Sequence, residues 1–199
     1  MKVYRAMRRL AGHARWKLSG MPSPPSHHYK VATLRALAKR YGLRVFVETG
    51  TLYGETIDLL SPSFDLCITI EVDPRLHALA IRRFAGRSSI RPILGDSAEV
   101  IPTVLAQLDR PALFWLDGHY SGGETSRGAK DTPIVSELEA ILAHSAAGHI
   151  VVIDDARLFN GMHDYPTLDQ LLTMVRRAWP DATSNVERDI IRILPPSSN

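Results

Sequence analysis

The stretch FVETGTLYGET, residues 46–56, decides the fold of this 199-residue chain. Phe46 and Val47 begin an apolar run that ends at an acid, and Gly50 and Gly54 follow before a short helical pattern. Glycine permits a tight turn and a close approach of the backbone to a ligand. The stretch is therefore typical of a turn that joins a buried strand to the helix after it.

The rest of the chain repeats this alternation of strand and helix. Such a pattern predicts parallel strands joined by right-handed crossovers, hence an α/β, doubly wound, Rossmann-like sheet with helices on both faces. The last segment, ATSNVERDIIRILPP, has two strand patterns without a helix between them, which predicts an antiparallel C-terminal hairpin and a mostly parallel sheet of seven strands. The other predicted strands are 44–48, 66–71, 91–94, 112–117 and 149–154, and the predicted helices lie at 28–42 and near 54–61, 74–85, 97–108, 132–145 and 166–178.

The composition is that of an ordinary globular protein, with 45% hydrophobic and 23% charged residues. No apolar run approaches the ~20 residues that span a bilayer. Cys67 is the single cysteine and cannot form an internal disulfide, so we expect a cytoplasmic location. The sequence has no zinc pattern, helix-turn-helix signature or aromatic ribonucleoprotein motif, and we therefore expect no nucleic-acid partner.

The first seventeen residues carry six basic side chains and no acid. Val3, Met7, Leu10 and Ala14 fall at helical spacing, which predicts a short basic amphipathic helix. We expect a solvated helix that packs on the domain by one face; weak contact with an anionic membrane surface or an acidic partner is the alternative, and the helix is also a candidate homodimer contact. The predicted divisions are 1–29 for this helix and a Pro/Ser linker, 30–195 for the main domain and 196–199 for a disordered tail.

Ligands of a doubly wound sheet gather at the carboxyl ends of its strands, and several predicted strands end on an acid. Glu48 precedes Gly50 in the first turn, where a carboxylate would repel a pyrophosphate but suits a ligand that carries an ammonium and a sulfonium group. Glu71 follows Gly50 at a distance of ~20 residues, which is typical of an acid that binds a ribose diol. Asp96 or Ser97 can accept a hydrogen bond from an adenine amino group or cap a helix.

Three further carboxylates follow the fourth and fifth predicted strands. Asp117 ends one strand, and Asp154 and Asp155 end the other, within VIDDARLF, residues 152–159. Neighbouring strands lie ~4.8 Å apart, so these hard oxygen ligands can converge on Mg²⁺ or a similar divalent ion. In the alternative, Asp154 caps the following turn and Asp155 pairs with Arg157, with no metal. Spacing alone leaves both interpretations open.

Four segments, in this order, resemble the class I S-adenosylmethionine-dependent methyltransferases: VETGTLYGET, ITIEVDP, ILGDSAEVIP and LFWLDGH. The resemblance covers roughly residues 30–195 and implies S-adenosylmethionine as cofactor. It places Glu48, Gly50 and Thr51 at the methionine part, Glu71 at the ribose and Asp96 with Ser97 at the adenine. The predicted cofactor-binding set is completed by Gly54 and Asp117.

The two later strand ends are similar to those of metal-dependent O-methyltransferases of the catechol and macrocin type, which carry an Asp after the fourth strand and an Asp-Asp or Asp-Asn pair after the fifth. This resemblance favours Mg²⁺ held by Asp117, Asp154 and Asp155, with a hydroxyl of a small molecule or sugar as methyl acceptor. The catechol-type lysine base is replaced by Tyr120. We therefore expect His119 to be the general base, with Tyr120 or Asp117 as substitutes.

Two other functions fit the same residues. One is a metal-independent methyltransferase whose aspartates hold an amine, and the other is a non-catalytic nucleoside-binding module of the same fold. The glycine-containing stretch 118–134 starts beside the predicted metal ligands and is a candidate substrate loop, in which Arg127 and Lys130 would meet an anionic substrate.

Overall fold

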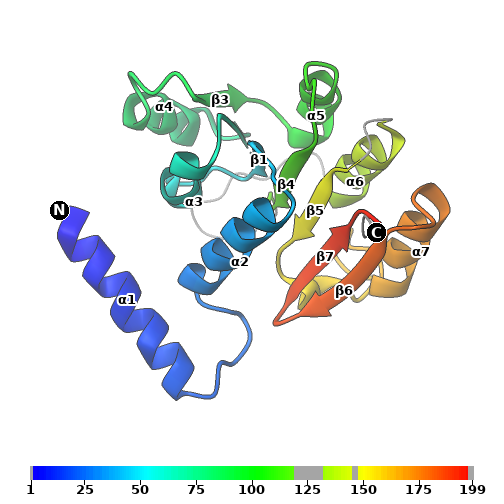
Figure 1. The fold of residues 1–199 in the computed structure, drawn as a ribbon, viewed down its shortest axis with the longest axis horizontal. Coiled ribbons are helices and arrows are strands. Elements are labelled where there is room, and N and C mark those ends of the chain that lie inside the picture. Colours follow the sequence, from blue (N-terminus) through cyan, green and yellow to red (C-terminus); the bar gives the residue numbers. More distant parts are fainter. Residues whose placement is uncertain (1, 119–131, 145–147, 197–199) are drawn as a thin grey trace.

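The computed structural model describes residues 2–118, 132–144 and 148–196, with side chains from residue 10 onward. Seven strands form one sheet in the order β3-β2-β1-β4-β5-β7-β6 (Figure 1). The strands are β1 (Val45–Thr49), β2 (Leu66–Glu71), β3 (Ile90–Leu94), β4 (Ala112–Leu116), β5 (Ile150–Ile153), β6 (Thr183–Glu187) and β7 (Ile190–Leu194). The helices are α1 (Lys2–Leu18), α2 (His27–Arg40), α3 (Glu55–Leu60), α4 (Pro74–Arg83), α5 (Ser97–Leu105), α6 (Ile134–Ala143) and α7 (Leu168–Ala178), with short 3₁₀ turns η1 (Ser61–Ser63) and η2 (Ala156–Leu158).

The pairing of the strands confirms the predicted sheet. β1 pairs in parallel with β2 and β4, β2 with β3, and β4 with β5, whereas β7 pairs antiparallel with both β5 and β6. The order reverses at β1, which has β2 on one side and β4 on the other. This reversal opens a crevice for ligands at the carboxyl ends of β1 and β4.

Alternating side chains along each strand bury both faces of the sheet, as expected for parallel strands covered by helices. On one face, Phe46, Cys67 and Trp115 pack against α2, α3 and α4. On the other face, Val47, Phe114 and Val151 pack against α5, α6 and α7. Strands β1, β4 and β5 therefore read as continuous apolar runs with polar residues at or just after their carboxyl ends, whereas the edge strand β6 is polar and mostly exposed.

Helix α2 begins and ends where local sequence signals place it. Ser26 is the N-cap and accepts a hydrogen bond from the Tyr29 amide, so the helix starts inside the segment predicted as linker. Gly42 follows the helix with φ +65°, the left-handed conformation common after a helix end.

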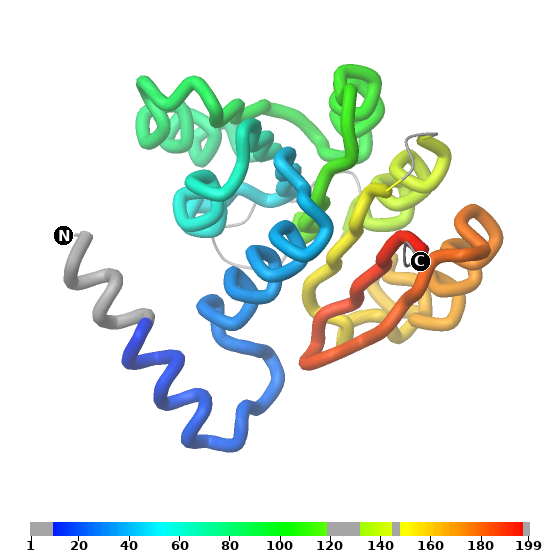
Figure 2. Tube along the Cα trace, viewed as in Figure 1, coloured from blue at the N-terminus to red at the C-terminus, as the bar shows by residue number. Residues whose placement is uncertain are grey.

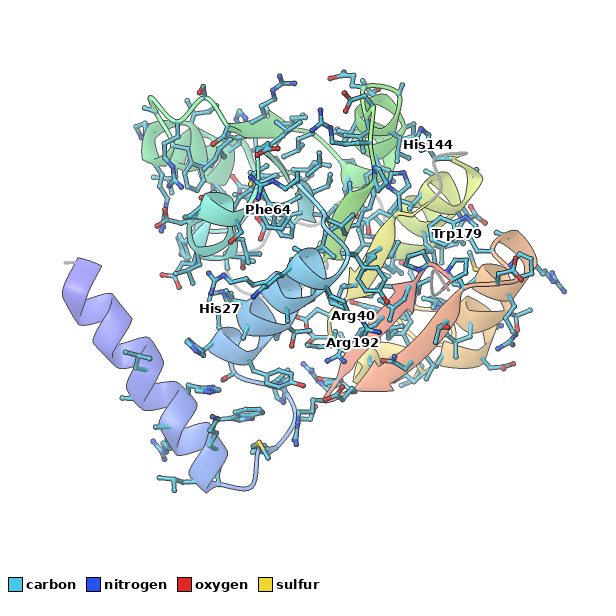
Figure 3. The ribbon with its side chains drawn as sticks, viewed as in Figure 1. His27, Arg40, Phe64, His144, Trp179 and Arg192 are labelled. Atoms are coloured by element: carbon cyan, nitrogen blue, oxygen red, sulfur yellow. The ribbon has the colours of Figure 1, made fainter. Side chains whose placement is uncertain are left out.

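Two histidine contacts lie in different parts of the domain (Figure 3). His27, at the amino end of α2, contacts Thr56 of α3, and His144, after α6, contacts His149 just before β5.

Helix α1 stands outside the body of the domain and contacts α2 through the end nearest the linker (Figures 1 and 2). Trp16 is buried there, whereas Leu10 and Ala14 are exposed. The helix thus packs by one face, as expected, but that face is not the apolar stripe of the sequence pattern. None of the helices in the described ranges is long and apolar enough to cross a membrane.

Candidate active site at the carboxyl ends of the strands

The turn after β1 is pressed against the end of β4. Gly50 has φ +80°, and a Cβ at this position would lie 2.6 Å from the backbone oxygen of Asp117. Real Cβ atoms do not approach an oxygen so closely, so glycine is required for this contact. At Gly54, the N-cap of α3, a Cβ would meet the Phe84 ring at 2.7 Å. Gly50 therefore lets the turn sit directly beside Asp117, and Gly54 lets the start of α3 pack against the Phe84 ring.

Glu48 lies beneath this turn and is only 2% exposed. Thr69 Oγ1 donates a hydrogen bond of 2.8 Å to its carboxylate, and Thr51 Oγ1 lies 2.6 Å from Thr69 Oγ1. Burial raises the pKa of Glu48 to about 8; the Thr69 hydrogen bond opposes this shift, and the negative charges of Asp117 and Glu71 add to it. Glu48 is therefore mostly protonated at pH 7, and the Thr51 hydroxyl takes part in the same internal chain.

Glu71 ties the end of β2 to the first turn. Its Oε2 accepts a hydrogen bond of 2.8 Å from the Leu52 amide, and its Oε1 accepts one of 3.0 Å from the Asp73 amide. Each carboxylate oxygen has two lone pairs, so these bonds leave acceptor capacity for further hydroxyl groups. The position fits the predicted ribose-binding role, which stays a prediction.

Asp96 is the N-cap of α5, and helix capping was one of the two roles predicted for it. Its side chain accepts a hydrogen bond of 3.0 Å from the Ala98 amide, and Ser97 is the mostly buried first residue of the helix. The structure places both residues at the end of β3, on the same edge of the sheet as Glu71. Their contact with adenine stays a prediction.

Apolar side chains are exposed at the same three strand ends. Leu52 and Tyr53 in the first turn, Val72 after β2 and Leu94 at the end of β3 are between 37% and 47% exposed. Apolar groups beside a few convergent polar ones are what a site for a flat, weakly polar ring requires. None of these four is among the site residues predicted from the sequence, which are polar residues and glycines. A usable signal was present at Val72, an apolar residue directly after a strand-ending acid.

The first strand-end aspartate of β5 is bound by a lysine from α2. Lys30 Nζ forms an ion pair with Asp154 Oδ2, and their side chains are 17% and 1% exposed. Burial lowers the pKa of Lys30, but Asp154, and more weakly Asp117 and Asp155, raise it more, so its pKa lies above the ordinary value. Burial raises the pKa of Asp154, and the Lys30 charge opposes that shift. Lys30 thus supplies the positive charge that compensates Asp154.

The second aspartate after β5, Asp155, pairs with Arg157 and not with Lys30. Asp155 has φ +54° and ψ +48°, a left-handed conformation that Asp tolerates better than most residues. Arg157 Nη1 donates a hydrogen bond of 2.7 Å to Asp155 Oδ1 and also binds Asp189 Oδ2 in the turn between β6 and β7. The Arg157 amide donates to Asp189 Oδ1 at 2.7 Å. The pairing of Asp155 with Arg157, which belonged to the metal-free alternative, is present, whereas Asp154 binds Lys30.

The predicted magnesium site is not confirmed. Among the described residues, no group of three or more His, Cys, Asp or Glu side chains is arranged to hold a metal ion. Asp117 lies close enough to Lys30 to raise its pKa, and its own amide donates to Thr49 Oγ1 at 3.2 Å. Of the three predicted metal ligands, Asp154 binds the Lys30 ammonium directly, and the charges of Asp117 and Asp155 add to the shift of the Lys30 pKa. The predicted catalytic residues His119 and Tyr120 lie outside the described residues, as do Arg127 and Lys130 of the candidate substrate loop.

A pocket lies beside Asp154 on the face covered by α6 and α7. Its empty volume is about 220 Å³, part of it open to solvent. Asp154 Oδ1 is buried and has no hydrogen-bond partner among the described residues. Burial raises the pKa of Tyr165 to about 12, so its hydroxyl keeps its proton at neutral pH. The lining combines apolar and polar side chains: Leu116, Thr132, Ile134, Glu137, Ile153, Asp154, Phe159 and Tyr165, with Gly118.

No protein-family model and no curated protein matches the chain. Solved structures do match it. An O-methyltransferase from Bacillus cereus, in complex with SAH (S-adenosylhomocysteine), is 15% identical, with a TM-score of 0.61 over 94% of this chain and 89% of that chain. The O-methyltransferase TomG from Streptomyces achromogenes, involved in tomaymycin synthesis and in complex with SAM (S-adenosylmethionine), is 18% identical, with a TM-score of 0.59 over 95% and 89%.

An N-methyltransferase is similar to the same degree. NodS from Bradyrhizobium japonicum, in complex with SAH, is 17% identical, with a TM-score of 0.57 over 96% of both chains. At such identities the shared property is the fold. The chain therefore has the Rossmann-like fold of SAM-dependent methyltransferases, as the four sequence segments predicted.

Proposed function

We propose that this chain is a SAM-dependent methyltransferase that methylates a hydroxyl group of a small molecule or sugar. The observation that carries the proposal is the convergence, at one edge of the sheet, of the Gly50 turn, the Glu71 carboxylate and the exposed apolar side chains. In this proposal Glu48, Gly50 and Thr51 lie at the methionine part of the cofactor. The Thr51 hydroxyl supports this part of the site through its internal contact with Thr69. Glu71 binds the ribose, and Val72 and Leu94 flank the adenine, next to Asp96 and Ser97.

The acceptor belongs on the other side of Asp117, in the pocket beside Asp154. Asp117 stands between the two halves: its backbone oxygen touches the Gly50 turn, and its charge acts on both Glu48 and Tyr165. The buried Asp154 Oδ1 is an acceptor that a substrate hydroxyl would satisfy. Tyr165 lines the same pocket beside apolar side chains, so an acceptor that carries a hydroxyl group would meet both polar and apolar groups there.

Methyl transfer needs little covalent assistance from the protein. When bound, S-adenosylmethionine would supply its methyl group to the acceptor oxygen and leave as a neutral thioether, while the hydroxyl proton would pass to a base. Most of the rate enhancement would come from holding oxygen, carbon and sulfur in line. His119 stays the predicted base, with Tyr120 or Asp117 as substitutes; of these three, Asp117 lies among the described residues.

A divalent ion does not fit the described carboxylates as they stand. Asp154 Oδ2 is bound by Lys30 and Asp155 Oδ1 by Arg157, so a metal ion would meet two cations at its own ligands. We therefore favour the metal-independent form of the proposed reaction over the Mg²⁺-assisted one. The Lys30 ammonium, near the acceptor pocket, provides positive charge that favours a developing alkoxide or phenolate oxygen.

Binding and turnover must be measured separately to test the proposal. Isothermal titration with SAH should give binding that Glu71→Gln weakens, while Glu139→Gln, on the exposed side of α6, leaves it unchanged. Radiolabelled SAM incubated with a panel of catechols, sugars and amines should then label a hydroxyl acceptor. Binding without transfer to any acceptor would favour the non-catalytic nucleoside-binding module, and transfer to amines alone would favour the N-methylating alternative.

A further inference from the structure

Helix α1 has two faces that differ sharply in exposure. Trp16 is buried, and its Nε1 donates a hydrogen bond of 2.7 Å to the Pro22 oxygen. Leu10 is 57% and Leu18 is 88% exposed, and Ala14 between them is exposed as well. At about 100° per residue, these three fall within a sector of about 80° whose centre lies about 160° from Trp16. The apolar stripe therefore faces away from the domain.

An aromatic cluster fixes this orientation. The Trp16 ring packs on His13 and Tyr29, with ring centroids 5.5 and 5.4 Å apart, and His13 Nδ1 lies 2.7 Å from Ser26 Oγ. The Arg188 guanidinium, in the turn between β6 and β7, lies 5.9 Å from the Trp16 ring centroid. Packing and hydrogen bonds thus hold the Trp16 face of α1 against the domain. The opposite face, with Leu10, Ala14 and Leu18, is therefore exposed to solvent.

The charges of α1 complement one kind of surface. The helix holds six Lys and Arg residues and no acid. Arg15 and Lys17 fall about 60° to 100° from the centre of the apolar stripe, one on each flank. Basic residues on both flanks of an exposed apolar stripe are characteristic of helices that lie in the interface of an anionic membrane, where long basic side chains reach the headgroups.

We propose that the face of α1 formed by Leu10, Ala14 and Leu18 binds the surface of an anionic membrane, with the helix lying in the plane of the headgroups. A second copy of this chain is the less suitable occupant. Two such helices packed stripe to stripe would bring their basic flanks together without an acid to compensate them. Anionic lipids supply the opposite charge along the whole helix and an apolar layer beneath it.

Vesicle co-sedimentation of the full chain tests this proposal. The chain should sediment with vesicles of phosphatidylglycerol and phosphatidylcholine, and much less with phosphatidylcholine alone. Leu10→Ser with Leu18→Ser should weaken this partitioning at least about tenfold, because both side chains lose apolar burial. The matched control is Leu79→Ser with Met162→Ser, two exposed apolar side chains outside α1, which should leave partitioning unchanged.

A second pair of variants separates charge from apolar insertion. Arg15→Gln with Lys17→Gln should weaken partitioning at least about threefold and make it less dependent on salt than in the wild type. The matched control, Arg82→Gln with Arg177→Gln at two exposed positions outside α1, should partition like the wild type. Equal sedimentation of the Leu10/Leu18 variant and its control would overturn the proposal. So would light scattering that shows a dimer of the wild-type chain which the Leu10/Leu18 variant loses, since the stripe would then be a subunit contact.

Discussion

Lys30 and Asp154 are 124 positions apart in the chain, yet the Lys30 ammonium is bound to Asp154 Oδ2 at the end of β5. The pair joins α2 to the central strands at the point where the proposed acceptor pocket begins. A carboxylate that is 1% exposed is costly without a partner, and Lys30 compensates Asp154 while Arg157 compensates the adjacent Asp155, so two neighbouring acids can follow an apolar strand.

Removing the lysine charge should destabilise the fold. Lys30→Met keeps most of the side-chain volume but leaves Asp154 buried without a cation, and we expect a loss of about 2–4 kcal/mol in the free energy of unfolding. Chemical denaturation measures it. Lys39→Met, exposed on the same helix, should cost less than about 0.5 kcal/mol. Lys30→Met in an Asp154→Asn background should cost much less than alone; equal costs would show that the two groups do not interact.

Divalent ions should have little effect on the wild-type chain. Because Lys30 and Arg157 already neutralise Asp154 and Asp155, millimolar Mg²⁺ should not raise the melting temperature of the chain in the presence of SAH, and EDTA should not lower it. In Lys30→Met the carboxylates lose their internal cation, so Mg²⁺ should stabilise this variant. A wild-type melting temperature that rises with Mg²⁺ and falls with EDTA would restore the metal site predicted from the sequence.

The exposed apolar side chains should contribute to nucleoside binding. Val72→Ser removes an apolar contact beside Glu71, and we expect SAH to bind about tenfold more weakly. Leu79→Ser, an equally exposed change on α4, provides the control and should bind SAH like the wild type. Titration calorimetry measures both, and equal affinities for the two variants would remove Val72 from the site.

Glu48 should couple cofactor binding to proton release. Its pKa of about 8 means that it is mostly protonated at pH 7, and a cationic ligand beside it favours the ionised form. Binding of SAM should therefore release a fraction of a proton at pH 7, seen as binding enthalpies that differ between phosphate and Tris buffers. Glu48→Gln should abolish the difference, whereas Glu99→Gln, exposed on α5, should retain it. An unchanged buffer dependence in Glu48→Gln would assign the proton to another group.

The same residue should make stability depend on pH. The ordinary pKa of 4.5 applies to the unfolded chain and about 8 to the folded one, so between these values the folded state holds the extra proton. The free energy of unfolding should then fall as pH rises from about 4.5 to about 8 through this group. Denaturation at several pH values checks the sign: Glu48→Gln should show a flatter profile over this window than the wild type.

The order of elements could be read from the sequence because the central strands β1, β4 and β5 are apolar runs separated by helical segments. The predicted strand 66–71 matches β2, and the predicted hairpin is β6 with β7. The acids at the strand ends were also correctly located, since the carboxyl ends of parallel strands meet at one edge. These features depend on periodicity and topology, which a single sequence contains.

The partners of the acids could not be read in the same way. Lys30 lies in an amphipathic segment where a basic residue normally faces solvent, and only tertiary packing brings it to Asp154. The magnesium prediction rested on the resemblance to metal-dependent O-methyltransferases and on three carboxylates, without knowledge that Lys30 lies beside Asp154. Val72 and Leu94 were missed for a related reason, because apolar residues at strand ends look like the ends of the core until their exposure is known.

The turn between β6 and β7 reaches two distant places: Asp189 holds the backbone and side chain of Arg157, and Arg188 lies against Trp16 of α1. The five parallel strands are translated before this hairpin. A nascent chain on the ribosome can thus assemble the nucleoside half of the crevice before this turn is available to contact Arg157 and Trp16. The Asp189 contacts with Arg157 and the Arg188 contact with Trp16 should consequently form together, after the five parallel strands have been translated.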